Sequence, residues 1–262
     1  MITLAIAQAE CSSDSESNFD TVARLCKQAA KLGCKAICFP EAFLTGYLPE
    51  QAAAVAIKSD CTLIDKVKDA ARRFEIDILV GFFECFEDRL FITQGVFCHN
   101  GKTALYRKTH LGEKESLIFS GGDSLDIFDL SCGLKIGFQL CVETHFARLT
   151  ETLSLNGAEV IFAPHAVPHS AGERERIWVK YIPARSYDNR VYFACCNHSG
   201  KRFGGGCMVT DPSGDIIASC FDGSEGLITF NVDTDLLCKY HCDNSSHRFR
   251  YYPKMLKKEL CR

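Results

Sequence analysis

The chain has 262 residues, of which 47% are hydrophobic and 24% are charged, and its formal net charge is −3. These values are typical of a globular protein with an ordinary hydrophobic core. The basic residues are scattered, so we expect neither nucleic acid nor an anionic membrane as a partner. No run approaches the roughly 18 apolar residues of a membrane helix, and residues 1–8 lack the basic leader of a signal peptide. We therefore expect a cytoplasmic protein.

Sixteen cysteines raise the question of a disulfide framework. The chain is long, has no secretory signal and needs no covalent staples, all of which argue against such a framework. Several thiols, among them Cys34, Cys38, Cys195 and Cys196, lie within apolar runs, where cysteine behaves as a small hydrophobic residue. The sequence contains no C-x-x-C motif. We expect most of the thiols to be reduced, buried and inert.

Strand-like and helix-like segments alternate over the first two-thirds of the chain. Apolar runs predict strands over 2–9, 35–39, 77–83, 91–98, 103–108, 125–130, 134–140, 159–163, 191–196, 205–210, 215–220 and 225–232. Helical spacing predicts helices over 18–32 and over about 61–74, 145–156 and 173–188. Two turn sequences, Asn100-Gly101 and 211–214, predict hairpins. We expect one layered α/β domain over 1–262 with more than one sheet, ending in an irregular tail over about 234–262.

Three polar residues follow predicted strands directly. Glu41 follows 36–40, Lys108 follows 103–107, and Cys141 follows 135–140. A rigid strand end opening into a loop is where α/β enzymes present a nucleophile. A carboxylate could accept the thiol proton, and an ammonium could stabilise an oxyanion. Taken singly, each residue also has a plainer interpretation: a surface glutamate, a solvated strand-end lysine and a core cysteine.

The order and context of these residues carry a family resemblance. The matching segments are 39–41 with 45–47, 106–111, Glu115 with Phe119 and Gly122, 137–146, 185–189 with Asn197 and Gly200, and 204–206 with 211–214. On these motifs the chain resembles the carbon–nitrogen hydrolases of the nitrilase superfamily, in their amidase-like branch. Each motif alone is weak, whereas their combination, order and spacing are specific, and they span Gln8 to about Val232.

The resemblance implies a four-layer α-β-β-α sandwich with two mixed sheets face to face. It implies that Glu41 is the general base, Lys108 the oxyanion-stabilising cation and Cys141 the nucleophile, with Glu115 as a second glutamate that holds Lys108 and the leaving group. It also implies a reaction that needs no metal or organic cofactor. Family members commonly pair through helices beside the site, here around 145–156 and 173–188, so we expect a homodimer or a larger homo-oligomer.

The residues after the nucleophile depart from the usual family pattern. Amidase-like members commonly carry Asp where this chain has Glu143, and nitrilases carry Trp where it has Val142. We expect hydrolysis of a small amide or N-carbamoyl compound through a thioester, with nitrile hydrolysis as the alternative, and the sequence leaves the particular substrate open. Candidate substrate-binding residues are Tyr47, Val142, Glu143 and His165, and an exposed Glu143 would select a cationic or hydrogen-bond-donating substrate.

Two alternatives come from other functional classes. Cys238-x-x-x-Cys242 with His241 and His247 offers zinc-ligand types at loose spacing, with Cys242 expected in a loop. A non-catalytic protein on the same scaffold would be expected to lack a member of the catalytic trio, and all three members are present. Acyl transfer to lipid would require membrane helices, which the sequence does not predict.

Overall fold

The computed structural model describes the backbone of residues 1–242 and the side chains of residues 1–240, and it places these residues in two six-stranded sheets. The first sheet has the order β12-β1-β2-β3-β4-β5. Its strands are β1 (Ile2–Gln8), β2 (Ala36–Cys38), β3 (Asp77–Phe86), β4 (Arg89–Phe97), β5 (Thr103–Arg107) and β12 (Gly226–Val232). The second has the order β11-β10-β9-β8-β7-β6. Its strands are β6 (Phe128–Asp129), β7 (Lys135–Phe138), β8 (Val160–His165), β9 (Tyr192–Asn197), β10 (Cys207–Thr210) and β11 (Ile216–Cys220).

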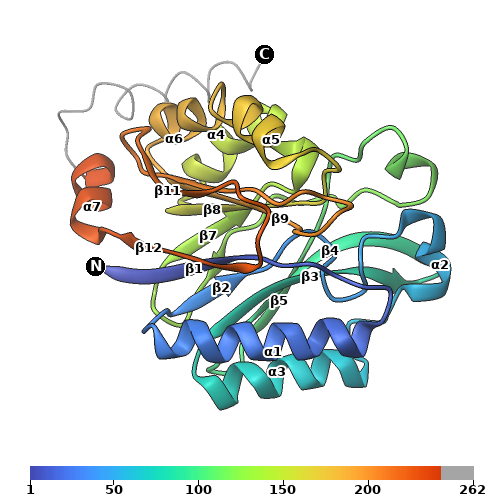
Figure 1. Ribbon diagram of the computed structural model, residues 1–262. Helices are drawn as coiled ribbons and strands as arrows, with labels where there is room; N and C mark the ends of the chain where they lie inside the picture. Colours follow the sequence, from blue (N-terminus) through green and yellow to red (C-terminus); the bar gives the residue numbers. More distant parts are fainter. Residues whose placement is uncertain (243–262) are drawn as a thin grey trace.

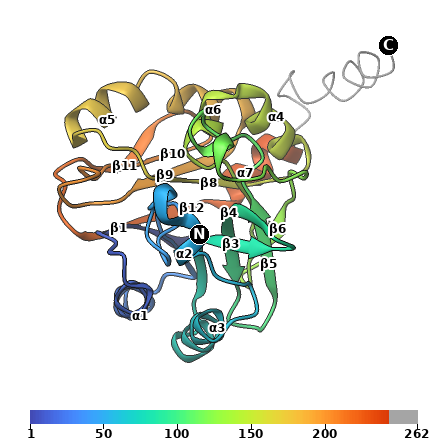
Figure 2. The same cartoon turned by 90° about the vertical axis from the view of Figure 1, so that its right-hand side faces the viewer.

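Helices cover the outer face of each sheet (Figure 1). Helices α1 (Ser15–Lys31) and α3 (Thr62–Phe74) lie against the first sheet, and α4 (Ala147–Leu155), α5 (Ala171–Trp178) and α6 (Ile182–Asn189) lie against the second. The remaining elements are α2 (Ala52–Val55), α7 (Thr234–Cys242) and three short 3₁₀ segments, η1 (Pro49–Gln51), η2 (Glu115–Leu117) and η3 (Cys141–His145). The view turned by 90° shows the same layers (Figure 2), so the expected four-layer sandwich is confirmed.

Alternating side chains of the strands build two kinds of core. On β1, Leu4 and Ile6 face inward and pack with Phe162 of β8 in the cluster between the sheets. The alternate residue Ala5 faces outward and packs with Leu25 of α1. This alternation follows from the two-residue repeat of a strand, and it explains why strands covered on both faces are apolar throughout.

Two predicted segments differ from the structure. The helix expected over 173–188 is divided into α5 and α6, with Pro183 in the first turn of α6. Proline lacks an N–H and its ring clashes with the carbonyl four residues earlier, so one continuous helix cannot form there. The irregular tail expected from 234 is wrong over residues 234–242, which form α7 and include Cys242.

Thirteen cysteines from Cys11 to Cys220 have described side chains and are free thiols. This agrees with the expectation that no disulfide framework holds the chain together. Within residues 1–242, no helix has both the length and the apolar character needed to cross a bilayer. The suggested zinc ligands His241, Cys242 and His247 have side chains outside the described residues.

Candidate active site

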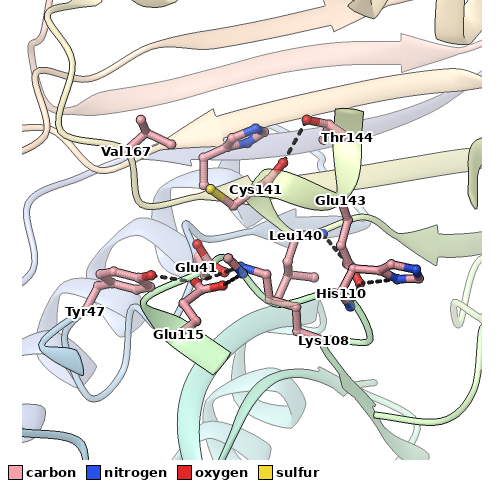
Figure 3. A network of polar contacts seen from close by, with 12 residues as sticks. Glu41, Tyr47, Lys108, His110, Glu115, Leu140, Cys141, Glu143, Thr144 and Val167 are labelled. Atoms are coloured by element: carbon pink, nitrogen blue, oxygen red, sulfur yellow. Dashed lines mark hydrogen bonds and ion pairs between the residues drawn. The ribbon is translucent and has the colours of Figure 1, made fainter. Parts of the chain in front are cut away.

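Three strand ends bring the expected catalytic side chains together between the sheets. Lys108 Nζ donates to Glu41 Oε1 at 2.7 Å and to Glu115 Oε1 at 2.8 Å. Tyr47 Oη donates to the same Glu115 oxygen at 2.6 Å. Figure 3 shows the Cys141 sulfur pointing toward this group of residues. Residues from positions 41 to 141 thus meet in one buried cluster, although each stands alone in the sequence.

The backbone is left-handed at two positions of the cluster. Cys141 has φ 50°, and Ala42, directly after Glu41, has φ 51°. For residues with a Cβ this conformation costs about 1–2 kcal/mol and persists only where the surrounding structure imposes it. The turn at Cys141 leads from β7 into η3, and Thr144 Oγ1 donates to the Cys141 carbonyl at 2.8 Å. This sharp reversal presents the sulfur at the end of the strand.

Glu41 has one oxygen engaged and one unengaged. Its Oε1 accepts from Lys108, whereas its fully buried Oε2 has no hydrogen-bond partner among the described residues. Burial raises the pKa of Glu41 to about 7, although the Lys108 ammonium opposes this rise. A carboxylate with a pKa near neutrality and an available oxygen is suited to accept and return a proton.

Lys108 and Glu115 remain charged at neutral pH. Burial opposes the ammonium form of Lys108, but the adjacent carboxylates outweigh it and raise the pKa. Burial likewise opposes ionisation of Glu115, but the charge of Lys108 and its hydrogen bond lower the pKa. Gly112 N–H also donates to Glu115 Oε2 at 2.6 Å. The glutamate is therefore held in place, and it holds the lysine in turn.

The Cys141 thiol is protonated at rest. Burial, together with the negative charge of Glu41, raises its pKa to about 12, although the Lys108 charge and the Ala166 N–H pull it down. A thiol of this kind attacks only if a neighbouring base takes its proton as the reaction proceeds.

Glu143 is fully buried, so it is not the exposed carboxylate that the sequence suggested. Its carboxylate accepts from the Tyr106 hydroxyl at 2.8 Å and from Leu140 N–H at 2.7 Å. It also accepts from Thr109 N–H at 2.9 Å and from His110 N–H at 3.0 Å. Glu143 therefore joins the loop after Lys108 to the loop before Cys141.

This network gives Glu143 a large expected effect on stability. We expect Glu143→Ala to lower the free energy of unfolding by about 3–5 kcal/mol, because it leaves several buried donors without acceptors. Glu175→Ala on the exposed face of α5 is the matched control and should stay within about 0.5 kcal/mol of the parent. Urea titration measures both variants, and equal midpoints for the two would contradict the assignment.

The other expected substrate-binding residues lie at different distances from solvent. Tyr47 is half-buried and bonded to Glu115, and Val142 is half-buried as the second residue of η3. The Val142 N–H belongs to the first turn of η3, where backbone donors lack acceptors within the helix. His165 is buried at the end of β8, and its carbonyl accepts from Glu41 N–H at 3.4 Å. Tyr47 and His165 thus contact the cluster directly.

The family model for carbon–nitrogen hydrolases matches residues 3–241. The chain belongs to the carbon–nitrogen hydrolase family. Its relatives include the deaminated glutathione amidase of Bos taurus, 29% identical over 89% of this chain and 77% of the relative. Another is a nitrilase of Pyrococcus abyssi, 27% identical over 85% of this chain and 86% of the relative.

Solved structures share the fold of this carbon–nitrogen hydrolase. An amidase from Nesterenkonia sp. superposes with a TM-score of 0.81 at 21% sequence identity, covering 96% of each chain. At this level of identity the likeness concerns the fold. It agrees with the two facing sheets and outer helices described above.

Arg174 of this carbon–nitrogen hydrolase is not among the residues that the sequence singled out. It lies on α5 and is only 3% exposed. Its guanidinium stacks over the Trp178 ring at 5.3 Å, a contact that contributes about 2 kcal/mol when desolvated. Within the part of the chain that the structure describes, Arg174 Nε and Nη2 have no hydrogen-bond partner. A helical pattern with arginine and tryptophan four residues apart was the available signal, because such residues share a helix face.

Proposed function

We propose that the protein hydrolyses the C–N bond of a small amide or N-carbamoyl compound with Cys141 as nucleophile. The observation that carries this proposal is the unengaged Glu41 Oε2, buried in the cluster toward which the Cys141 sulfur points. The opposite oxygen of Glu41 is held by Lys108, so the free oxygen is fixed in direction. The arrangement of base, cation and thiol supports acyl transfer to Cys141.

In the first half of the reaction, Glu41 accepts the thiol proton while the Cys141 sulfur attacks the substrate carbonyl carbon. Lys108 and the N–H of Val142 stabilise the oxyanion of the tetrahedral intermediate. The intermediate collapses as Glu41 returns the proton to the nitrogen, and the C–N bond breaks. Ammonia or an amine leaves, and a thioester remains on Cys141.

In the second half, water replaces the leaving group. Glu41 takes a proton from the water, and the oxygen attacks the thioester carbonyl. The same two donors stabilise the second oxyanion, and the C–S bond breaks as the sulfur regains its proton. The carboxylic acid leaves, and Glu115 keeps Lys108 in position throughout. Apart from substrate and water, the groups in this scheme are side chains and backbone groups of the chain.

The relatives support this class of reaction. The Bos taurus relative is named an amidase and the Pyrococcus abyssi relative a nitrilase, which supports amide hydrolysis as the proposal and nitrile hydrolysis as its alternative. A structure of the Nesterenkonia sp. AN1 amidase contains acrylamide added to its active-site cysteine. Ammonia release from a panel of amides, N-carbamoyl compounds and nitriles tests the proposal. Release of ammonia from nitriles alone would show that the reaction is nitrile hydrolysis and that the proposed amide hydrolysis is wrong.

The pH dependence of activity follows from Glu41. Because the deprotonated carboxylate is the active form, kcat/KM should fall as pH decreases through the Glu41 pKa of about 7. Below that point the loss should approach about tenfold per pH unit. A profile of kcat/KM between roughly pH 5 and pH 9 measures it. An acid limb near the ordinary glutamate pKa of about 4.3 would contradict the assignment of Glu41 as the base.

We also propose that the enzyme forms a homodimer or larger homo-oligomer through α4, α5 and α6. Exposed apolar side chains on and beside these helices support this, namely Phe146, Leu155, Val179 and Tyr187. We expect the native protein to elute with at least twice the 29.1 kDa monomer mass in light-scattering chromatography. Val179→Arg should shift it toward monomer, and a monomeric parent would contradict the proposal.

We further propose a cytoplasmic location. The thirteen described cysteines from Cys11 to Cys220 are free, and several of them are half-buried. Free thiols in such positions persist in a reducing compartment and form disulfides in an oxidising one. Fractionation of the source cells tests this.

A further inference from the structure

Three buried side chains form a group beside Cys141 that the hydrolysis scheme does not use. They are His165, Arg174 and Trp178, and we call them the Arg174 cluster. Arg174 and Trp178 stand four residues apart on α5, so they share one helix face. The Trp178 ring lies 4.8 Å from the His165 ring. The aliphatic stem of Arg174 packs on Gly206, where a Cβ would lie 2.9 Å from Arg174 Cγ.

Strand register places this cluster level with the nucleophile. Strands β7 and β8 are parallel, with Phe138 opposite Phe162. Cys141 and His165 each lie three residues beyond this pair, at the same edge of the sheet. Ala166, the next residue, directs its N–H to the Cys141 sulfur. A negative charge on Cys141 would raise the pKa of Arg174, which agrees with this placement.

The cluster holds several buried polar atoms that have no hydrogen-bond partner among residues 1–240. Two are guanidinium donors, Arg174 Nε and Nη2, and a third is the indole donor Trp178 Nε1. His165 Nδ1 lies 2.7 Å from the Ala163 carbonyl, which fixes the proton on that nitrogen and leaves Nε2 as an unpartnered acceptor. Buried polar groups are normally paired, so a group of unpaired donors calls for an acceptor from outside the chain.

The cation also has no counter-ion in the described part of the chain. No carboxylate among these residues lies within ion-pair distance of the Arg174 guanidinium. Its sequence neighbours Glu173 and Glu175 are exposed to solvent, to either side of Arg174 on α5. A buried charge is strongly unfavourable unless it is paired. A planar guanidinium is matched best by a carboxylate, which accepts two parallel hydrogen bonds.

We propose that the Arg174 cluster binds a carboxylate on the acyl part of the substrate, so that the enzyme acts on amides of dicarboxylic acids. Arg174 donates to this carboxylate from its fork, and Trp178 Nε1 adds a third donor. His165 Nε2 accepts from an N–H of the same substrate. Arg174 is then a specificity-determining residue, which the reaction at Cys141 does not require. This inference rests on the proposed amide hydrolysis.

The test compares anionic and neutral amides of similar length. We expect kcat/KM for glutaramate and succinamate to exceed that for valeramide and butyramide by about 100-fold. In Arg174→Met, which removes the charge and keeps the stem, this ratio should fall to near one. Arg176→Met on the exposed face of α5 is the matched control and should keep the parent ratio. If Arg174→Met fails to fold, the ratio of kcat/KM between anionic and neutral amides in the parent enzyme still tests the proposal.

Binding without turnover separates this inference from the proposed function. Calorimetry with Cys141→Ala should detect glutaramate, and the added Arg174→Met change should abolish that binding. Cys141-dependent hydrolysis of both amide classes at equal kcat/KM would overturn the carboxylate site and leave amide hydrolysis standing. An equal loss for both classes in Arg174→Met would also overturn it. Arg174-dependent glutaramate binding by a protein that hydrolyses no amide would instead refute the proposed function.

Discussion

Cys141→Ala is expected to lower kcat for amide hydrolysis by roughly 10⁶-fold, the scale of loss when a covalent hydrolase loses its nucleophile. The reason is that the Cys141 thiol lies beside a buried base, Glu41, and a buried cation, Lys108. The sulfur points toward the Glu41–Lys108 pair, and the strained φ of 50° at Cys141 serves to present it there. Ammonia release at saturating substrate measures the effect.

The control must show that the loss belongs to this thiol. Cys61→Ala removes a half-buried sulfur at the start of α3, a helix that covers the outer face of the first sheet. This variant should keep kcat within about twofold of the parent. Mass spectrometry after rapid acid quenching should find the acyl group on the peptide that contains Cys141. Near-normal turnover by Cys141→Ala, or an acyl group on another cysteine, would refute the mechanism.

Much of the fold could be predicted because its signals are local. Strands covered on both faces, such as β8, read as continuous apolar runs, and α1 carries its apolar residues at helical spacing. The division between α5 and α6 was missed, since apolar spacing continues across it while Pro183 interrupts the hydrogen bonding. Polar residues predict an irregular tail from residue 234, but residues 234–242 form the short helix α7.

The site residues also differ in whether local sequence or distant contacts determine their surroundings. Glu41, Lys108 and Cys141 could be found because each follows a recognisable strand and because their order and context resemble the family pattern. Glu143 was misjudged because its burial depends on Tyr106 and on the loop after β5, which are distant in sequence. The loop position suggested exposure, whereas donors that sequence spacing cannot reveal enclose the carboxylate.

Lys108 is the second residue whose loss should have a large effect, because it separates two buried carboxylates. Its Nζ bonds to Glu41 and to Glu115, and its side chain is fully buried. Without the ammonium, two negative groups would share a site of low dielectric constant, where one of them takes up a proton. Lys108 lowers the pKa of Glu41 at present, so its removal should raise that pKa above about 7.

Lys108→Met should therefore reduce activity in two separable ways. Loss of an oxyanion donor should lower kcat by about 10²–10³-fold at any pH. Protonation of Glu41 should lower it further near neutral pH, and this part should return as pH rises, because the deprotonated base is the active form. Profiles of kcat against pH measure both parts. Lys102→Met at the exposed β4–β5 hairpin is the control. An unchanged acid limb in Lys108→Met would contradict the coupling between this lysine and Glu41.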